Sequence, residues 1–142
     1  MGDKLGLEGR IGGSGPAGPA GPAGPAGPPY ETVTSDTAAS AGNVARRLSG
    51  GHIEKAMGGT VGDGDACVGM YGANVAGGGS AQLYKSGSRC PVAGLPVDVL
   101  WRSNTGTAVQ YSSIVSGEYT NRIGYSDGAG VDINIGPEEQ KP

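Results

Sequence analysis

Glycine occupies every third position in the first part of the chain, at Gly6, Gly9, Gly12, Gly15, Gly18, Gly21, Gly24 and Gly27. These glycines divide residues 6–29 into eight Gly-X-Y triplets, of which four are Gly-Pro-Ala and the last is Gly-Pro-Pro. This period is that of a triple helix, in which three polyproline-II chains wind together and only glycine fits at the crowded axis. A stiff single-chain linker needs no such register. The pattern therefore predicts three parallel chains and a homotrimer.

The collagen-like segment is short, and its Y positions are mostly alanine. A rod of 24 residues would be about 70 Å long and would need its ends held together. We therefore expect the part of the chain after residue 29 to be trimeric itself or to bind a threefold site.

The sequence thus predicts five regions. They are an N-terminal lead (1–5), the collagen-like triple helix (6–29), a linker or first strand (30–42), a β-domain (43–136) and an exposed polar tail (137–142).

Composition excludes several classes of protein. No apolar run approaches the roughly 18 residues that span a bilayer, and no charged and then apolar segment typical of a signal peptide opens the chain. The net charge of −3 makes the chain a poor phosphate binder. We expect neither a membrane nor a nucleic-acid partner.

The remaining residues form short β-branched and aromatic runs that are separated by Gly, Ser, Asn and Asp. No segment carries a sustained apolar period of 3.6 residues, which would indicate a helix. We predict an all-β barrel or sandwich, with strands at 44–48, 52–56, 66–71, 81–84, 97–102, 107–112, 122–125 and 131–135.

The β-domain also repeats itself at an offset of 55 residues. The offset aligns Arg47 with Arg102, Gly51 with Gly106, and the run 68–70 with the run 123–125. We predict two copies, at about 43–91 and 98–136, which close one barrel of about eight strands and so remove exposed sheet edges.

A family resemblance rests on this repeated pattern. Residues 66–71 with Gly77–Gly79, and residues 121–125 with Gly128–Gly130, resemble the small β-barrel capsid decoration (cement or head-fibre) proteins of tailed phages. The resemblance covers roughly residues 32–136 and implies a structural virion protein. Such a protein binds the outside of the capsid, stabilises it, and has the major capsid protein or its virion neighbours as partners. The sequence itself does not decide which end of this chain is attached to the particle, but the resemblance favours attachment through the β-barrel.

A second interpretation is a tail-fibre or collar-fibre tip that binds a receptor on the host surface. Such an adhesin would carry an exposed aromatic cluster, for which Tyr111, Tyr119 and Tyr125 are the candidates.

The chemistry of the side chains argues against an enzyme. His52 is the only histidine, so the chain has few residues from which a His-based catalytic site could be built. Residues 62–65 read Gly-Asp-Gly-Asp but lack the rest of a twelve-residue calcium loop, and a solvated turn is the simpler interpretation. Gly77–Gly79 is not followed by the Lys of a phosphate-binding loop. We expect no catalytic residue, metal or cofactor.

Two cysteines, Cys67 and Cys90, leave three alternatives open. They form an intrachain disulfide, remain free thiols, or cross-link neighbouring proteins in a particle. A bridge would contribute about 3 kcal/mol by closing the loop between them.

Four residues are candidates for a capsid or subunit interface. Arg47 and Arg102 occupy equivalent repeat positions and are expected to share a role, either as solvated strand charges or in ion pairs with a capsid. Leu100 and Trp101 are adjacent in one predicted strand, which cannot bury both on one face. We expect one of the two to face another subunit or the shell.

Overall fold

The computed structural model describes residues 29–142, and this part of the chain is built from strands joined by turns. The lead (1–5) and the glycines Gly6 to Gly27 lie outside the described residues. The elements in chain order are β1 (Glu31–Thr34), β2 (Val44–Arg47), β3 (Ile53–Lys55), β4 (Cys67–Tyr71), β5 (Ser80–Lys85), β6 (Arg89–Cys90), β7 (Asp98–Arg102), β8 (Ala108–Gln110), the 3-10 helix η1 (Tyr111–Ser113), β9 (Tyr119–Ser126), β10 (Val131–Ile133) and β11 (Glu138–Gln140). The prediction of an all-β fold is confirmed.

Each of the eight predicted strands coincides with a strand of the structure. Three further strands lie outside those runs. β1 falls in the region expected to be a linker or first strand, and β6 is only two residues long. The tail was expected to be an exposed polar end, and four of its six residues are exposed. Glu138–Gln140 also form β11, which pairs with β9. The polar side chains of the tail gave no sequence signal for this backbone pairing.

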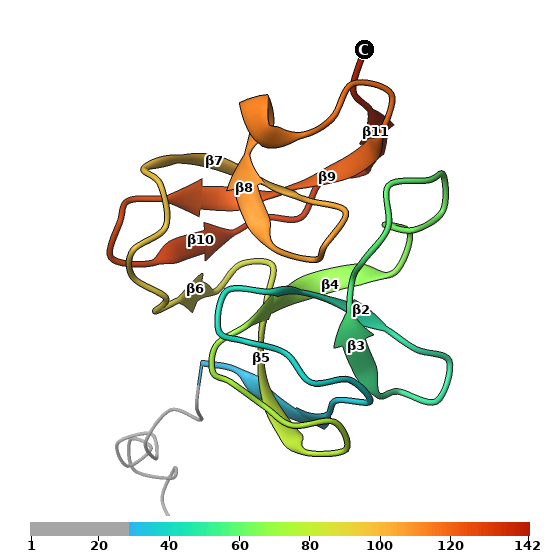
Figure 1. The fold of residues 1–142 in the computed structure, drawn as a ribbon. Helices are drawn as coiled ribbons and strands as arrows, with labels where there is room; N and C mark the ends of the chain where they lie inside the picture. Colours follow the sequence, from blue (N-terminus) through green and yellow to red (C-terminus); the bar gives the residue numbers. More distant parts are fainter. Residues whose placement is uncertain (1–28) are drawn as a thin grey trace, which may run out of the picture.

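The strands form two curled antiparallel sheets rather than one eight-stranded barrel. The first sheet has the order β1-β5-β4-β2-β3, and the second has the order β6-β10-β9-β7-β8 with β11 added on β9. Figure 1 shows the first sheet in the lower half of the molecule and the second in the upper half. Each sheet thus holds one run of consecutive strands, β1 to β5 or β6 to β10.

The two sheets also share their register. Arg46 pairs with Glu54 in the first sheet, and Trp101 pairs with Val109 at the same offset of 55 in the second. A β-bulge follows Ala45 in the pairing of β2 with β4, and another follows the equivalent residue Leu100 in the pairing of β7 with β9. The sequence offset therefore has a direct counterpart in backbone pairing, and the structural units begin one strand earlier than the copies in the sequence.

One glycine in each unit is required by close backbone approach. A Cβ at Gly69 would lie 2.0 Å from the carbonyl oxygen of Tyr84, and a Cβ at Gly124 would lie 2.0 Å from that of Asp132. Both distances are far shorter than any real carbon–oxygen contact. Both carbonyls belong to the neighbouring strand on the side away from the bulge, β5 for Gly69 and β10 for Gly124.

The apolar residues form two clusters. The larger lies between the sheets, where Val44, Met70 and Tyr84 of the first pack against the face of the second that carries Leu100 and Ile123. The smaller lies on the other face of the first sheet and comprises Ala39, Ala45, Ile53, Tyr71, Ala81 and Leu83. Loops before β2 and before β5 cover it and are joined by a bridge between Ala39 and Val75.

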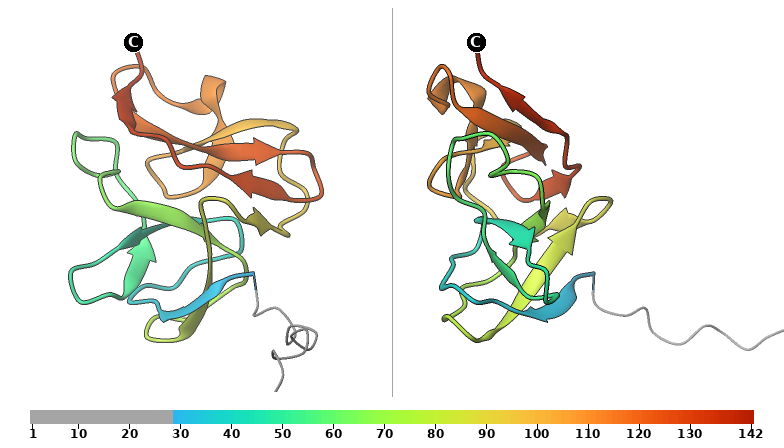
Figure 2. Two further views of the ribbon diagram at one scale, coloured as in Figure 1. Left: turned by 180° about the vertical axis from the view of Figure 1, so that it is seen from behind. Right: turned by 90° about the vertical axis from the view of Figure 1, so that its right-hand side faces the viewer.

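The first sheet is therefore covered on both faces, while the second is covered on one. Residues on the outer face of the second sheet are half-buried or exposed, among them Val99, Arg122, Tyr125 and Asp132. The view from the side in Figure 2 shows the two sheets stacked one above the other.

Candidate functional site

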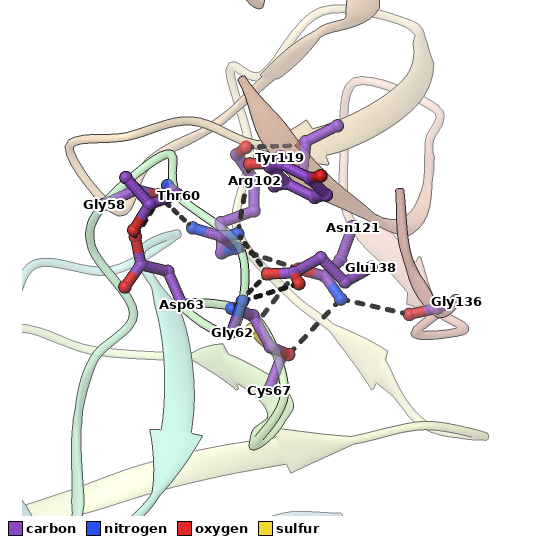
Figure 3. A network of polar contacts seen from close by, with 12 residues as sticks. Gly58, Thr60, Gly62, Asp63, Cys67, Arg102, Tyr119, Asn121, Gly136 and Glu138 are labelled. Carbon is purple, nitrogen blue, oxygen red and sulfur yellow. Dashed lines mark hydrogen bonds and ion pairs between the residues drawn. The ribbon is translucent and has the colours of Figure 1, made fainter. Parts of the chain in front are cut away.

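The only fully buried charged side chain in the described residues is that of Arg102, at the end of β7. Its Nε donates to Asn121 Oδ1 (2.9 Å), and its Nη atoms donate to the carbonyl oxygens of Gly58 and Tyr119. Nη2 also lies 3.7 Å from Oε2 of Glu138, which is 8% exposed. Figure 3 shows the guanidinium enclosed by these groups. A buried charge is tolerated when it is paired and hydrogen-bonded in this way.

Glu138 connects this network to the first half of the chain. Its two carboxylate oxygens accept the backbone N–H groups of Gly62 and Gly64, each at 2.8 Å. A Cβ at Gly64 would lie 1.9 Å from Asn121 Oδ1, so only glycine fits there. The backbone of this turn thus holds the carboxylate with two N–H groups that are two residues apart.

The Gly-Asp-Gly-Asp turn is therefore an internal anchor. Asp63 accepts hydrogen bonds from the backbone N–H and the hydroxyl of Thr60, and these lower the pKa of its carboxyl group. Among residues 29–142, no group of three or more His, Cys, Asp or Glu side chains is placed to hold a metal ion.

Two of the predicted interface residues are buried instead. Arg102 is 1% exposed and Leu100 is fully buried between the sheets. The prediction of an interface is wrong for Arg102, because β7 turns its side chain toward the core, whereas the burial of Leu100 is compatible with the expectation that one of Leu100 and Trp101 faces a partner. Trp101, between them, points to the outer face and is half-buried.

Arg47 does not share the role of Arg102. It lies at the surface and forms an ion pair with Glu31 through Nη2 and Oε1 (2.9 Å). Hydrogen bonding from Arg47 lowers the pKa of Glu31, with Lys85 adding to the effect, and burial opposes them. The expected common role of the two arginines is wrong, since only Arg102 has lost its contact with water.

Both cysteines are free thiols. Cys90 is buried, and burial raises its pKa to about 12. Burial is also the main cause that raises the pKa of Cys67 to about 11. Thiols with such pKa values stay protonated at neutral pH and are poor nucleophiles.

His52 lies at the surface. Its Nδ1 is 2.8 Å from Oδ1 of Asp36, and both side chains are about half exposed. The pair lies outside the two hollows described below.

The outer face of the second sheet carries an aromatic pair. The rings of Trp101 and Tyr111 meet edge to face with centroids 4.7 Å apart. The ammonium group of Lys141 lies 4.8 Å from the centre of the Tyr111 ring, and it donates to the carbonyl oxygens of Tyr111 and Ile114. Of the two neighbours Leu100 and Trp101, the tryptophan is thus the one available to a partner.

A hollow of about 270 Å³ lies on the same outer face, lined by Val99, Arg122, Gly124, Tyr125, Asp132 and Asn134. Tyr125 is 47% exposed there. Tyr111 packs against Trp101 instead, and the carbonyl of Tyr119 accepts from Arg102. Tyr111 and Tyr119 do not line the hollow, so the three tyrosines do not form the single cluster expected of an adhesin.

A second hollow, of about 410 Å³, lies where the described chain begins. It is lined by Pro29, Tyr30, Glu31, Leu83, Lys85, Ser86, Gly87 and Ser88. Tyr30 packs on Tyr84 with ring centroids 5.4 Å apart. Sequence reasoning gave no signal for this hollow, because it arises from the pairing of β1 with β5.

The chain was compared with protein families, curated proteins and solved structures. No protein-family model, curated protein or solved structure matches the chain. Within residues 29–142, no helix has the length and apolar character needed to cross a membrane.

Proposed function

We propose that this chain is a homotrimeric structural protein of a phage virion, which binds and stabilises the outside of the capsid. The observation that carries the proposal is the run of eight Gly-X-Y triplets, which ends at Pro29, two residues before β1 begins. Only a triple helix requires that register, so three β-domains would be joined by one collagen-like segment.

The described domain supports a role in binding rather than catalysis. Its buried charges satisfy one another, its thiols are held protonated, and its hollows lie at the surface. The outer face of the second sheet offers Trp101, Tyr125 and Arg122, which are residue types enriched at protein interfaces.

Stabilisation would follow from mass action. A protein that binds the assembled shell but not its separated subunits shifts the equilibrium toward the shell. Three domains on one rod raise the overall affinity without any new contact, provided that the rod lets them reach their sites together. The major capsid protein is the partner that this mechanism requires.

A receptor-binding fibre tip is the alternative. The half-exposed Tyr125 beside a surface hollow favours it, because an aromatic ring with polar neighbours can hold a small polar ligand.

Two measurements test the proposal. Sedimentation equilibrium of the full chain should give three times the chain mass of 13.9 kDa. Gly21→Asp should abolish the triple-helix signal in circular dichroism, because no side chain fits at the axis. The matched control is Ala20→Asp, one residue earlier at a Y position, which should keep that signal. A monomeric full chain, or equal spectra for the two variants, would contradict the trimer.

Position in the particle is tested by copy number. Quantitative protein measurement of purified virions should find on the order of hundreds of copies for a decoration protein that covers a shell of repeated sites. A few to a few dozen copies, with loss of host adsorption but intact heads on deletion, would instead establish the fibre-tip alternative.

A further inference from the structure

The hollow at the start of the described chain lies where neighbouring copies would meet. The last triplet ends at Pro29, and β1 begins at Glu31. Each residue extends the chain by at most about 3.6 Å, so Glu31 lies within about 14 Å of Gly27 along the chain. In a triple helix the glycines of all three chains lie at one axis. The beginnings of the three β1 strands must then face one another across that axis.

Backbone hydrogen bonds fix the turn at residues 86–88, which lines the hollow. The turn at residues 86–88 bonds to β10 of the second sheet, since Gly87 N–H donates to the Ile133 carbonyl and Ile133 N–H donates to that of Ser88, both at 2.9 Å. Its other end continues from β5, which pairs with β1. Both sheets therefore fix the position of the turn relative to Tyr30.

The hollow and the turn that lines it suit a contact about a threefold axis. The hollow is about 410 Å³ in volume, and the turn at residues 86–88 forms one wall of it. Ser86 is exposed, and its Oγ accepts a hydrogen bond from the Ile135 N–H (3.0 Å). Close to a threefold axis, this one surface of each copy meets both neighbours. Such a contact closes after three copies and leaves no free end.

We propose that this surface, made by Tyr30, Glu31 and residues 85–88, is the contact between the β-domains of a homotrimer, with the hollow of each copy filled by a neighbouring copy. The inference rests on the proposed triple helix, and it assigns the surface that holds the end of the rod together. Lys85 and Glu31 form an ion pair at its edge (3.3 Å), where a neighbour's polar groups can join them.

Cross-linking of the full chain tests the contact. Ser86→Cys should form disulfide-linked dimers under mild oxidation, because the turns surround the axis. Val115→Cys is the matched control, since Val115 is 59% exposed, lies in the loop after η1 and does not line the hollow. The native thiols are the same in both variants and stay protonated.

A bulky residue tests whether the hollow is filled. Ser86→Trp should raise the concentration at which the trimer dissociates by at least about tenfold, which corresponds to about 2.8 kcal/mol per trimer because the dissociation constant of three chains varies with the square of the concentration. Val115→Trp should change this concentration less than about twofold. Circular dichroism of the strands checks that each variant folds. A stable trimer in which Ser86→Cys links no faster than Val115→Cys, or in which Ser86→Trp has no effect, would overturn this contact and leave the trimer standing. A monomeric parent chain would overturn both.

Discussion

The first and second sheets share strand order, register and bulge, and they differ in what covers them. The face of the first sheet that carries Val44 and Met70 is packed on the second sheet. The equivalent residues of the second sheet are Val99 and Tyr125, which face solvent. The same backbone arrangement therefore places this face inside the fold in the first sheet and on the surface in the second sheet.

This difference shows which properties of a repeated unit follow from its backbone and which follow from its position. Glycine at 69 and 124 is required in both units, since the partner strand approaches equally closely. The arginines at 47 and 102 have opposite environments, because only one of them lies under β11. The place of a unit in the fold thus determines whether an equivalent side chain is buried. The pairing of the strands determines at which positions there is room for a side chain.

The largest expected difference is between the two arginines. Arg102→Met should lower the free energy of unfolding by about 3 to 5 kcal/mol, because the buried carboxylate of Glu138 loses its counterion. Arg47→Met breaks only a surface ion pair and should cost less than about 1 kcal/mol. Urea unfolding of the two variants measures both values, and equal losses would contradict the buried network.

The equivalent pair Met70 and Tyr125 should differ next. Met70→Ala removes a fully buried side chain from between the sheets and should cost about 3 kcal/mol. Tyr125→Ala removes a half-exposed ring and should change stability by no more than about 0.5 kcal/mol. If Tyr125→Ala weakens trimer assembly or capsid binding while leaving urea unfolding unchanged, the outer face is a contact surface.

The equivalent glycines should behave alike. Gly69→Ala and Gly124→Ala each force a methyl group against a backbone carbonyl and should cost about 2 kcal/mol. Thermal unfolding of the two variants checks this. A marked difference between them would show that one pair of strands, β4 with β5 or β9 with β10, separates more easily than the other.

The smallest expected effect concerns Cys67, whose equivalent in the second sheet is Arg122. Burial raises the pKa of this thiol to about 11 from 9.0, so the folded chain keeps a proton that the unfolded chain releases. The contribution of this thiol to the free energy of unfolding is fully present below pH 9 and is lost as the pH rises toward 11. From pH 8 to pH 10 it should contribute a loss of about 1 kcal/mol.

Cys67→Ala should remove that part of the pH dependence and leave the part due to Cys90 and the buried tyrosines. Urea unfolding at the two pH values measures it. Identical pH dependence in the parent and the variant would show that water reaches the thiol.

The sequence predicted the strands well because their signals are local. β-branched residues between turn residues mark β2 to β5 and β7 to β10, and the offset of 55 identifies the repeat. The arrangement as two sheets could not be predicted from the sequence. A closed barrel and two stacked sheets both require the same alternation of apolar and polar residues along each strand.

The central network was not accessible either. Glu138 stands in a tail of polar residues, and Asn121 precedes a strand that was predicted to begin at residue 122. Nothing in their local sequence shows that they meet Arg102, because those contacts bridge 36 and 19 positions of the chain. Arg47 and Arg102 are aligned by the repeat, which predicted a shared role. Their roles differ because Arg102 is buried and Arg47 lies at the surface.

The bond between Glu138 and the turn at 62–64 has a consequence for the order of events during synthesis. The turn leaves the ribosome 74 to 76 residues before the carboxylate that it binds. At about 5 to 20 residues per second, this is a delay of about 4 to 15 s. During that interval the first sheet can pair its strands, while the N–H groups of Gly62 and Gly64 lack the carboxylate that they bind in the finished domain. The domain is therefore completed from its last strand, since β11 brings the Glu138 carboxylate to this turn.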